Sequence, residues 1–190
     1  SKIVEGKTIN RIVDETKIGR HGLVVVGHRK ALLTDEIPSC TVEKIMRHCQ
    51  VPVLSISAVH DIKKIKHIVF ATDLETTPVY VVKQLGRLQH ALQAKLHIVK
   101  INTREDWISS REAQDQFDRF QEIQKLSNFE FVVYNDKTAE EGIQHYASDI
   151  GAGLIAMGIH NARPGDKLLD HHIAEDVLKK SPQILWTCTT

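Results

Sequence analysis

The segment 67–101, "HIVFATDLETTPVYVVKQLGRLQHALQAKLHIVKI", indicates the fold of this chain. It opens with a short β-branched run that stops at Asp73, and it closes with a second apolar run over residues 95–101. Between the two runs, apolar residues recur at helical spacing, and Pro78 suits the start of a helix. These helical positions are Val81, Leu85, Leu88 and Leu92. Two strands joined by a helix predict a βαβ unit, in which the strands lie parallel.

The residues after 101 continue the same alternation. Further strands are predicted over 129–134, 153–158 and 183–187, and further helices over 110–126, 138–150 and 172–180. In the first of these helices, Phe117, Phe120 and Ile123 are expected to point inward. The segment 65–190 therefore predicts an α/β domain with a Rossmann-like, doubly wound parallel five-stranded sheet.

The first 58 residues repeat only the end of this pattern. The stretch "GLVVVGHRK" (22–30) matches "GLIAMGIHN" (153–161), and "TVEKIMRHCQVPVLSI" (41–56) matches "IAEDVLKKSPQILWT" (173–187). A helix predicted over 9–22 precedes the first copy. We therefore expect residues 1–58 to be the C-terminal half of a first domain, 59–64 a linker and 65–190 a complete second domain. We also expect the natural protein to have a first half of domain one that this chain lacks.

Charge and composition exclude several classes of partner. The formal net charge is +1, from 25 basic and 24 acidic residues, and no basic patch for nucleic acid stands out. The apolar runs are far shorter than the ~20 residues that cross a bilayer. Three cysteines, Cys40, Cys49 and Cys188, lack the spacing of a disulfide framework or a thiolate zinc site. We expect a cytoplasmic protein with no nucleic-acid and no membrane partner.

Several short motifs resemble the universal stress protein family, in its tandem-domain form. They are "ATD" (71–73), "LHIV" (96–99), "MG" (157–158) and "AEDVL" (174–178), joined by "VVG" (25–27), "VEKIM" (42–46) and "VPVLSI" (51–56) in the first copy. The resemblance implies an adenine nucleotide alpha hydrolase-like fold, with one full domain plus a C-terminal half-domain. It also implies ligands at the carboxyl ends of the strands and pairing through the last strands.

The resemblance further implies a site for an adenine nucleotide. Carried over residue by residue, that site comprises Ala71, Thr72, Asp73, Ile98, Met157, Gly158, His160, Asn161, His171, His172 and Ile173. Family members that bind ATP are similar in having a loop G-x-x-G-x9-G-[ST], whose glycines let the backbone approach phosphate. Here only the first glycine is present, because asparagine and two histidines replace the others. The first copy, with Gly27, Lys30 and Ser39–Cys40, is degenerate as well.

Asp73 leaves two interpretations open. At the end of a strand, its carboxylate can accept from a ribose hydroxyl or an adenine amine. It can equally cap the turn that follows, as aspartate often does.

Other residues suggest weaker alternatives. His160, His171 and His172 fall on one loop–helix junction, so they could bind a divalent metal or an anion, or simply be exposed. Cys40 at a helix start could be reactive or merely small. The stretch "HDIKKIKH" (60–67) is typical of a solvated linker. No P-loop, G-x-S-x-G elbow or H-E-x-x-H motif occurs, so we do not expect an enzyme, with a weak ATPase as the alternative.

The main hypothesis is a non-catalytic stress-response protein with no obligatory cofactor. It would act as a homodimer, or by inter-domain pairing, through the final strands "PVLSI" (52–56) and "QILWT" (183–187), toward a protein partner that the sequence does not name. The first alternative is a stress sensor that binds ATP or another adenine nucleotide. The second is a metal- or anion-binding module that uses the three histidines.

Overall fold

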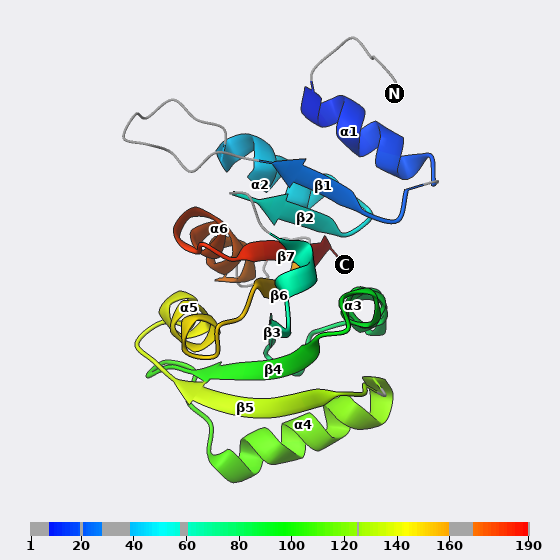
Figure 1. Cartoon of the computed structure of the whole chain (residues 1–190). Coiled ribbons are helices and arrows are strands. Elements are labelled where there is room, and N and C mark those ends of the chain that lie inside the picture. Colours follow the sequence, from blue (N-terminus) through cyan, green and yellow to red (C-terminus); the bar gives the residue numbers. More distant parts are fainter. Residues whose placement is uncertain are drawn as a thin grey trace.

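The computed structural model describes residues 8–19, 21–27, 39–57, 61–124, 126–159 and 169–189. Its elements in the first copy are α1 (Thr8–Lys17), β1 (Val24–Gly27), α2 (Ser39–His48) and β2 (Val53–Ile56), followed by the 3₁₀ turn η1 (Ile62–Lys64). The rest of the chain forms β3 (His67–Ala71), α3 (Val79–Leu92), β4 (Lys95–Asn102), α4 (Ser110–Gln124), β5 (Phe129–Asn135), α5 (Ala139–Asp149), β6 (Leu154–Ile159), α6 (Leu169–Lys180) and β7 (Ile184–Thr189). Figure 1 shows helices on both sides of one central sheet.

The sheet has seven strands in the order β1-β2-β7-β6-β3-β4-β5. Neighbouring strands are parallel throughout, except that β2 pairs with β7 in antiparallel orientation. Strands β3 to β7 alone form a five-stranded parallel sheet, since each is separated from the next by a crossover helix. The predicted α/β fold with a Rossmann-like parallel sheet is confirmed, and β1 and β2 extend that sheet by two strands.

The internal repeat is visible in the strand register. In β1 and β2, Val24 lies beside Val53, and in β6 and β7, Ile155 lies beside Leu185. These two pairs occupy equivalent positions of the aligned sequences. The β1–β2 pair is therefore a copy of the β6–β7 pair in register as well as in sequence.

The antiparallel seam between β2 and β7 relates the two copies by an approximate two-fold axis. Leu54 lies directly opposite Trp186, which is its own counterpart in the repeat. Two ion pairs cross between α2 and α6, joining Glu43 to Lys179 and Arg47 to Glu175. Glu43 corresponds to Glu175 in the aligned copies, and Arg47 corresponds to Lys179. The two ion pairs are therefore equivalent, as a two-fold arrangement requires.

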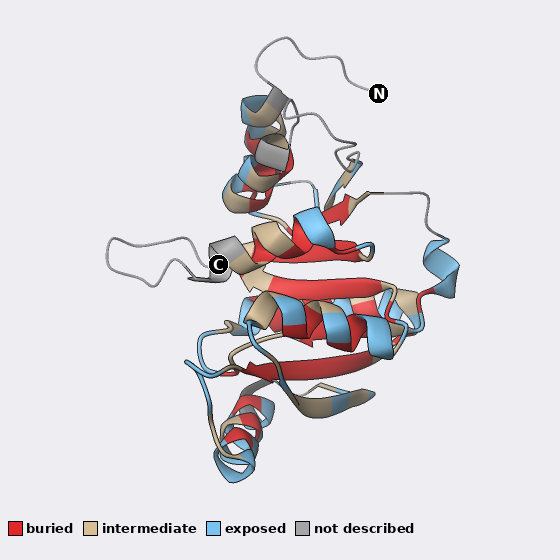
Figure 2. Ribbon diagram, turned by 90° about the vertical axis from the view of Figure 1, so that its left-hand side faces the viewer, coloured by how far each residue is buried: buried red, intermediate tan, exposed pale blue. Residues whose placement is uncertain are grey.

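The core forms one layer on each face of the sheet. Residues of α1, α2, α5 and α6 fill the layer on the first face, and residues of α3 and α4 fill the layer on the second. Figure 2 shows the buried strands between helices whose outer sides are exposed. The predicted inward positions are confirmed at Val81, Leu85, Phe117 and Phe120, which are at most 5% exposed, and Leu88 and Leu92 are partly buried. The side chain of Ile123 lies outside the described part.

The basic stretch before β3 is only partly the solvated linker that was expected. Its exposed residues are 61–64, which include η1, and Lys66. Asp61 accepts a hydrogen bond there from the Lys63 amide at 3.2 Å. The expectation is wrong for Ile65, which is 4% exposed, and for His67, which begins β3. Within the described ranges, no helix is both long enough and apolar enough to cross a membrane.

Candidate functional site

The candidate site lies at the carboxyl edge, which we define as the end of the sheet where β3, β4 and β6 finish. Ala71 lies between Val99 of β4 and Met157 of β6, and the Thr72 amide donates to the Val99 carbonyl at 3.1 Å. Gly158 is the next residue after Met157 within β6. The backbone segments predicted for a nucleotide site therefore meet at one edge, where ligands of parallel α/β sheets usually bind.

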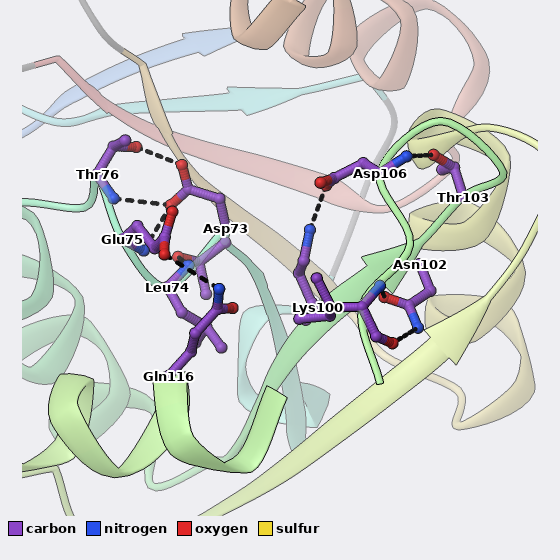
Figure 3. A network of polar contacts seen from close by, with 11 residues as sticks. Asp73, Leu74, Glu75, Thr76, Lys100, Asn102, Thr103, Asp106 and Gln116 are labelled. Carbon is purple, nitrogen blue, oxygen red and sulfur yellow. Dashed lines mark hydrogen bonds and ion pairs between the residues drawn. The ribbon is translucent and has the colours of Figure 1, made fainter. Parts of the chain in front are cut away.

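Asp73 uses both carboxylate oxygens to hold the turn that follows it. Oδ1 accepts from the backbone amides of Glu75 and Thr76, both at 3.0 Å, and Oδ2 accepts from the Thr76 hydroxyl at 2.5 Å. Figure 3 shows these three bonds converging on one side chain. This is the geometry of a turn cap, the second of the two roles that the sequence allowed.

Thr72 is engaged in the same turn. Its hydroxyl lies 2.8 Å from that of Thr77 and accepts from the Leu74 amide at 2.9 Å. Leu74 has a left-handed backbone, with φ of 70°, and its side chain is only 5% exposed. A non-glycine residue takes this conformation only where its surroundings hold it there, so the turn is tightly specified by its own contacts.

The apolar residues carried over from the family do not form one pocket. Ile98 is fully buried in the layer beneath α3 and α4, together with Phe70. Met157 belongs to the layer on the opposite face, and Ile173 of α6 packs against that same layer. A ligand at this edge could therefore reach backbone atoms of β4 and β6, but it could not contact the side chains of Ile98 and Met157 together, because they lie on opposite faces of the sheet.

Gly158 is not required by packing. A Cβ added there would meet Val81 Cγ1 at 3.7 Å, which is an ordinary contact. Its neighbour on β7 is Cys188, and burial raises the pKa of that thiol to about 12. The thiol is therefore protonated near neutral pH, and it offers no nucleophile to the site.

Lys100 and Asp106 form an ion pair that the sequence analysis did not predict. The Lys100 side chain is 7% exposed, whereas that of Asp106 is 68% exposed. The loop between them is held by Asn102, whose side-chain amide donates to the Ile108 carbonyl at 2.9 Å. Figure 3 shows this ion pair together with the Asp73 turn. A lysine inside a strand that is otherwise buried was the available signal, because buried lysines need a partner.

A second polar network lies at the opposite end of the same strands. His97 Nε2 is 3.0 Å from His67 Nδ1, and His97 Nδ1 is 3.0 Å from the Tyr146 hydroxyl. Burial lowers the pKa of His97, and the charges of His67 and Lys95 lower it further. The neutral ring fits this chain of hydrogen bonds, because one nitrogen donates while the other accepts.

The predicted histidine cluster falls mostly outside the described part of the chain. His160 and Asn161 are outside it, and so are the side chains of His171 and His172. The helix begins at Leu169, ahead of the predicted start at residue 172, so both histidines lie within the first turn of α6. Among the residues that the structure describes, no three His, Cys, Asp or Glu side chains gather as a metal site would require.

The hollow beside the Asp73 turn is small. It has a volume of ≈ 240 Å³ and is lined by Leu74, Glu75, Gln116, Arg119 and Phe120. Gln116 Nε2 donates to Glu75 Oε1 at 3.0 Å and ties α4 to the turn. Small-molecule sites usually occupy ~300–1,000 Å³, so this hollow is smaller than a typical small-molecule site.

Comparison with solved structures shows the same fold. A universal stress protein from Archaeoglobus fulgidus superposes with a TM-score of 0.69 at 15% identity, over 95% of this chain and 64% of that chain. A functionally unknown protein from Pseudomonas aeruginosa superposes with a TM-score of 0.67 at 17% identity, over 98% of this chain and 69% of that chain. The present chain thus spans 64% of the length of the first of these proteins.

Comparison at the level of sequence identifies the family. A search of curated proteins finds no significant match. The model of the universal stress protein family, however, matches residues 64–187, which is well over half of the chain. The chain belongs to the universal stress protein family.

Proposed function

We propose that this chain is a non-catalytic stress-response protein that acts by associating with another polypeptide, without requiring an adenine nucleotide. Membership of the universal stress protein family supports the stress-response role. The claim that no nucleotide is required is supported by the hydrogen bonds of Asp73. The carboxylate that would accept from a nucleotide already accepts three hydrogen bonds from its own turn.

Freeing that carboxylate has a free-energy cost that can be gauged. Three hydrogen bonds at Asp73 would have to be broken or shared, each with a net worth of about 0.5–1.5 kcal/mol. The sum is about 1.5–4.5 kcal/mol, which corresponds to a loss of roughly 10- to 2,000-fold in affinity. The phosphate loop predicted from sequence lacks its later glycines, so it offers little to offset this loss.

Association is supported by the arrangement of the strands. The final strands β2 and β7 pair with each other inside the chain, so they are not free edges for a second copy. The described part of the chain presents another apolar edge at β1, where the Val25 side chain is 58% exposed. A polypeptide partner at such an edge requires no catalytic group.

Calorimetry on the full chain tests the proposal. Mg-ATP, ADP, AMP and zinc are each titrated, and phosphate release from ATP is followed in parallel. We expect no saturable heat at micromolar concentration and no hydrolysis. Micromolar heat with ATP that is lost in Asp73→Ala, and kept in Asp61→Ala, would overturn the proposal. Asp61 is a matched control because it also caps a turn, but at η1.

An adenine-nucleotide sensor is the second candidate. The geometry that favours it is the meeting of Ala71, Met157 and Gly158 at one edge. The triple variant Asn161→Gly, His171→Gly, His172→Ser restores the glycines of the family loop. A gain of ATP affinity in this variant would favour the sensor, whereas an unchanged titration would mean that the Asp73 turn closes the site.

A further inference from the structure

A polar hollow lies at the opposite end of the sheet from the Asp73 turn, where β4 and β5 begin. It has a volume of ≈ 250 Å³ and is lined by residues of 86–94, at the end of α3, and by residues 126–128, which lead from α4 into β5. The described lining thus comes from one continuous stretch, α3 to β5. The volume is below the ~300–1,000 Å³ of typical small-molecule sites, so a ligand here would be small.

Gln89 is the buried polar side chain of this hollow, with 7% of its surface exposed. Its side-chain amide donates to the carbonyls of Ser127 and Asn128, both at 3.0 Å, and lies 3.3 Å from the carbonyl of Ala94. A carbonyl oxygen can only accept, so the amide nitrogen faces these three groups and the amide oxygen Oε1 faces away from them. Gln89 therefore ties α3 to the turn before β5 and keeps Oε1 as an acceptor.

Two further side-chain amides of the lining are oriented in the same way. The Gln93 amide donates to the His90 carbonyl at 2.7 Å, and the Asn128 amide donates to the Ala94 carbonyl at 3.2 Å. Both residues have a left-handed backbone, with φ of 51° and 50°, which their surroundings must hold in place. All three amides thus spend N–H donors on backbone carbonyls, and each keeps an oxygen that can accept from a ligand.

The electrostatics of the hollow favour a cation that carries N–H donors. The C-terminal end of α3, which is the negative end of its helix dipole, lies against the hollow. None of the described lining residues is acidic, whereas calcium and magnesium sites normally use carboxylates. His90 is the one described histidine of the lining, and zinc needs three or four ligands.

An alkyl stem also has a place beside these oxygens. Leu126 packs against the core layer beneath α3 and α4, and it lines the hollow. Gly86 lines it as well, and a Cβ added there would meet no atom within 4 Å. The methylene groups of an amine can lie along such a surface while the charged end reaches the polar groups.

We propose that this hollow binds a primary ammonium group on a short alkyl stem. The ammonium has three N–H donors, which match the side-chain oxygens of Gln89, Gln93 and Asn128. A free alkylamine and the lysine side chain of a polypeptide share this chemistry. The site goes beyond the proposed function, because it lies at the other end of the sheet from the Asp73 turn.

An NMR titration of the isotope-labelled full chain tests the site. Butylammonium chloride is the probe, and tetramethylammonium and potassium chloride at equal ionic strength are the controls. Tetramethylammonium has the same charge but no N–H donor. We expect saturable shifts of the Gln89, Gln93 and Asn128 side-chain amide signals with butylammonium, and at least about tenfold weaker binding of tetramethylammonium.

Two variants of Gln93 reverse the sign of the effect. Gln93→Lys puts a covalent ammonium at the hollow and should weaken butylammonium binding at least about tenfold, whereas Gln93→Glu supplies a carboxylate and should tighten it at least about threefold. Both variants lose the hydrogen bond to the His90 carbonyl, so a merely structural effect would change both affinities in the same direction. Gln114→Lys and Gln114→Glu are the matched controls, because Gln114 is an exposed glutamine of α4 outside the described lining. They should bind as the parent chain does.

A second pair of probes distinguishes the two sources of the ammonium. Putrescine represents a free amine, and lysine blocked by acetyl and methylamide groups represents a polypeptide. Tighter binding of putrescine would assign the site to a free amine, and tighter binding of the blocked lysine would assign it to a lysine side chain.

Three outcomes would overturn the inference. They are unchanged side-chain amide signals with butylammonium, an equal response to tetramethylammonium or potassium, and a change of affinity in the same direction in Gln93→Lys and Gln93→Glu. Failure of the proposed function is read separately, because the nucleotide titrations report on the Asp73 turn.

Discussion

Replacing Thr187 by valine should make the protein more stable. Thr187 lies in β7 opposite Val53 of β2 and is 1% exposed, and its hydroxyl has no hydrogen-bond partner in the described structure. A buried hydroxyl without a partner costs about 1–3 kcal/mol, and valine keeps nearly the same shape without it. We expect Thr187→Val to raise the free energy of unfolding by about 1 kcal/mol, or roughly 2–4 °C in Tm for a chain of this size.

Thr189 offers the same chemical change with the opposite sign. Its hydroxyl donates to the Met46 carbonyl at 2.7 Å, so Thr189→Val should lower the free energy of unfolding by about 1 kcal/mol. Urea unfolding is followed by tryptophan fluorescence, in which Trp186, 1% exposed and in the seam, changes environment on unfolding far more than the other tryptophan, Trp107, which is already 67% exposed. If Thr187→Val lowers the free energy of unfolding as much as Thr189→Val does, then water reaches the Thr187 hydroxyl, and the pairing of β2 with β7 described here is contradicted.

Three further predictions concern the rest of the chain. Burial lowers the pKa of His97 below its ordinary 6.5, so the unfolded chain binds more protons than the folded chain, and the free energy of unfolding should fall as the pH drops below about 6.5. Urea midpoints at pH 7.5 and 5.5 measure this fall, and His97→Gln should make it smaller. Gly142→Ala should lower the free energy of unfolding by about 1–3 kcal/mol in the same urea assay, because the added Cβ would lie 2.7 Å from Ile101 Cγ2. Gly86→Ala in α3 should raise the free energy of unfolding by about 0.5–1 kcal/mol, because its Cβ meets no atom within 4 Å. Iodoacetamide at pH 8 should alkylate Cys188 at least tenfold more slowly in the native chain than in urea, because the pKa of this buried thiol is about 12; equal rates would show that it is accessible.

Much of the fold could be predicted because burial imposes a period on the sequence. The helical spacing of Val81 and Leu85, and that of Phe117 and Phe120, reflects the layer into which they pack. The internal repeat likewise predicted that β1 and β2 copy β6 and β7. The sequence left open whether the final strands pair within one chain or between two. That choice depends on contacts such as Leu54 with Trp186, which join residues far apart in the chain and leave no local signal.

The candidate site was less predictable, because its chemistry depends on neighbours that the strand pattern does not specify. The sequence allowed two roles for Asp73, a nucleotide acceptor or a turn cap. In the structure its carboxylate accepts from the Glu75 and Thr76 amides, which is the turn-cap role. The ion pair of Lys100 with Asp106 depends on how a loop folds back over its strand. Residues 160–168 lie outside the described part, so the degenerate phosphate loop stays a prediction from sequence.

A titration of the isotope-labelled full chain with Mg-ATP, monitored by amide chemical shifts, tests the role of the Asp73 turn most directly. The claim under test is our proposal that Asp73, one of the residues that the family resemblance implies for a nucleotide site, is held by the hydrogen bonds of its own turn. We expect the amides of Thr72, Glu75 and Gly158 to keep their chemical shifts up to millimolar nucleotide. Saturable shifts at these three amides in the micromolar range would contradict it, and the protein would then be a nucleotide-binding sensor.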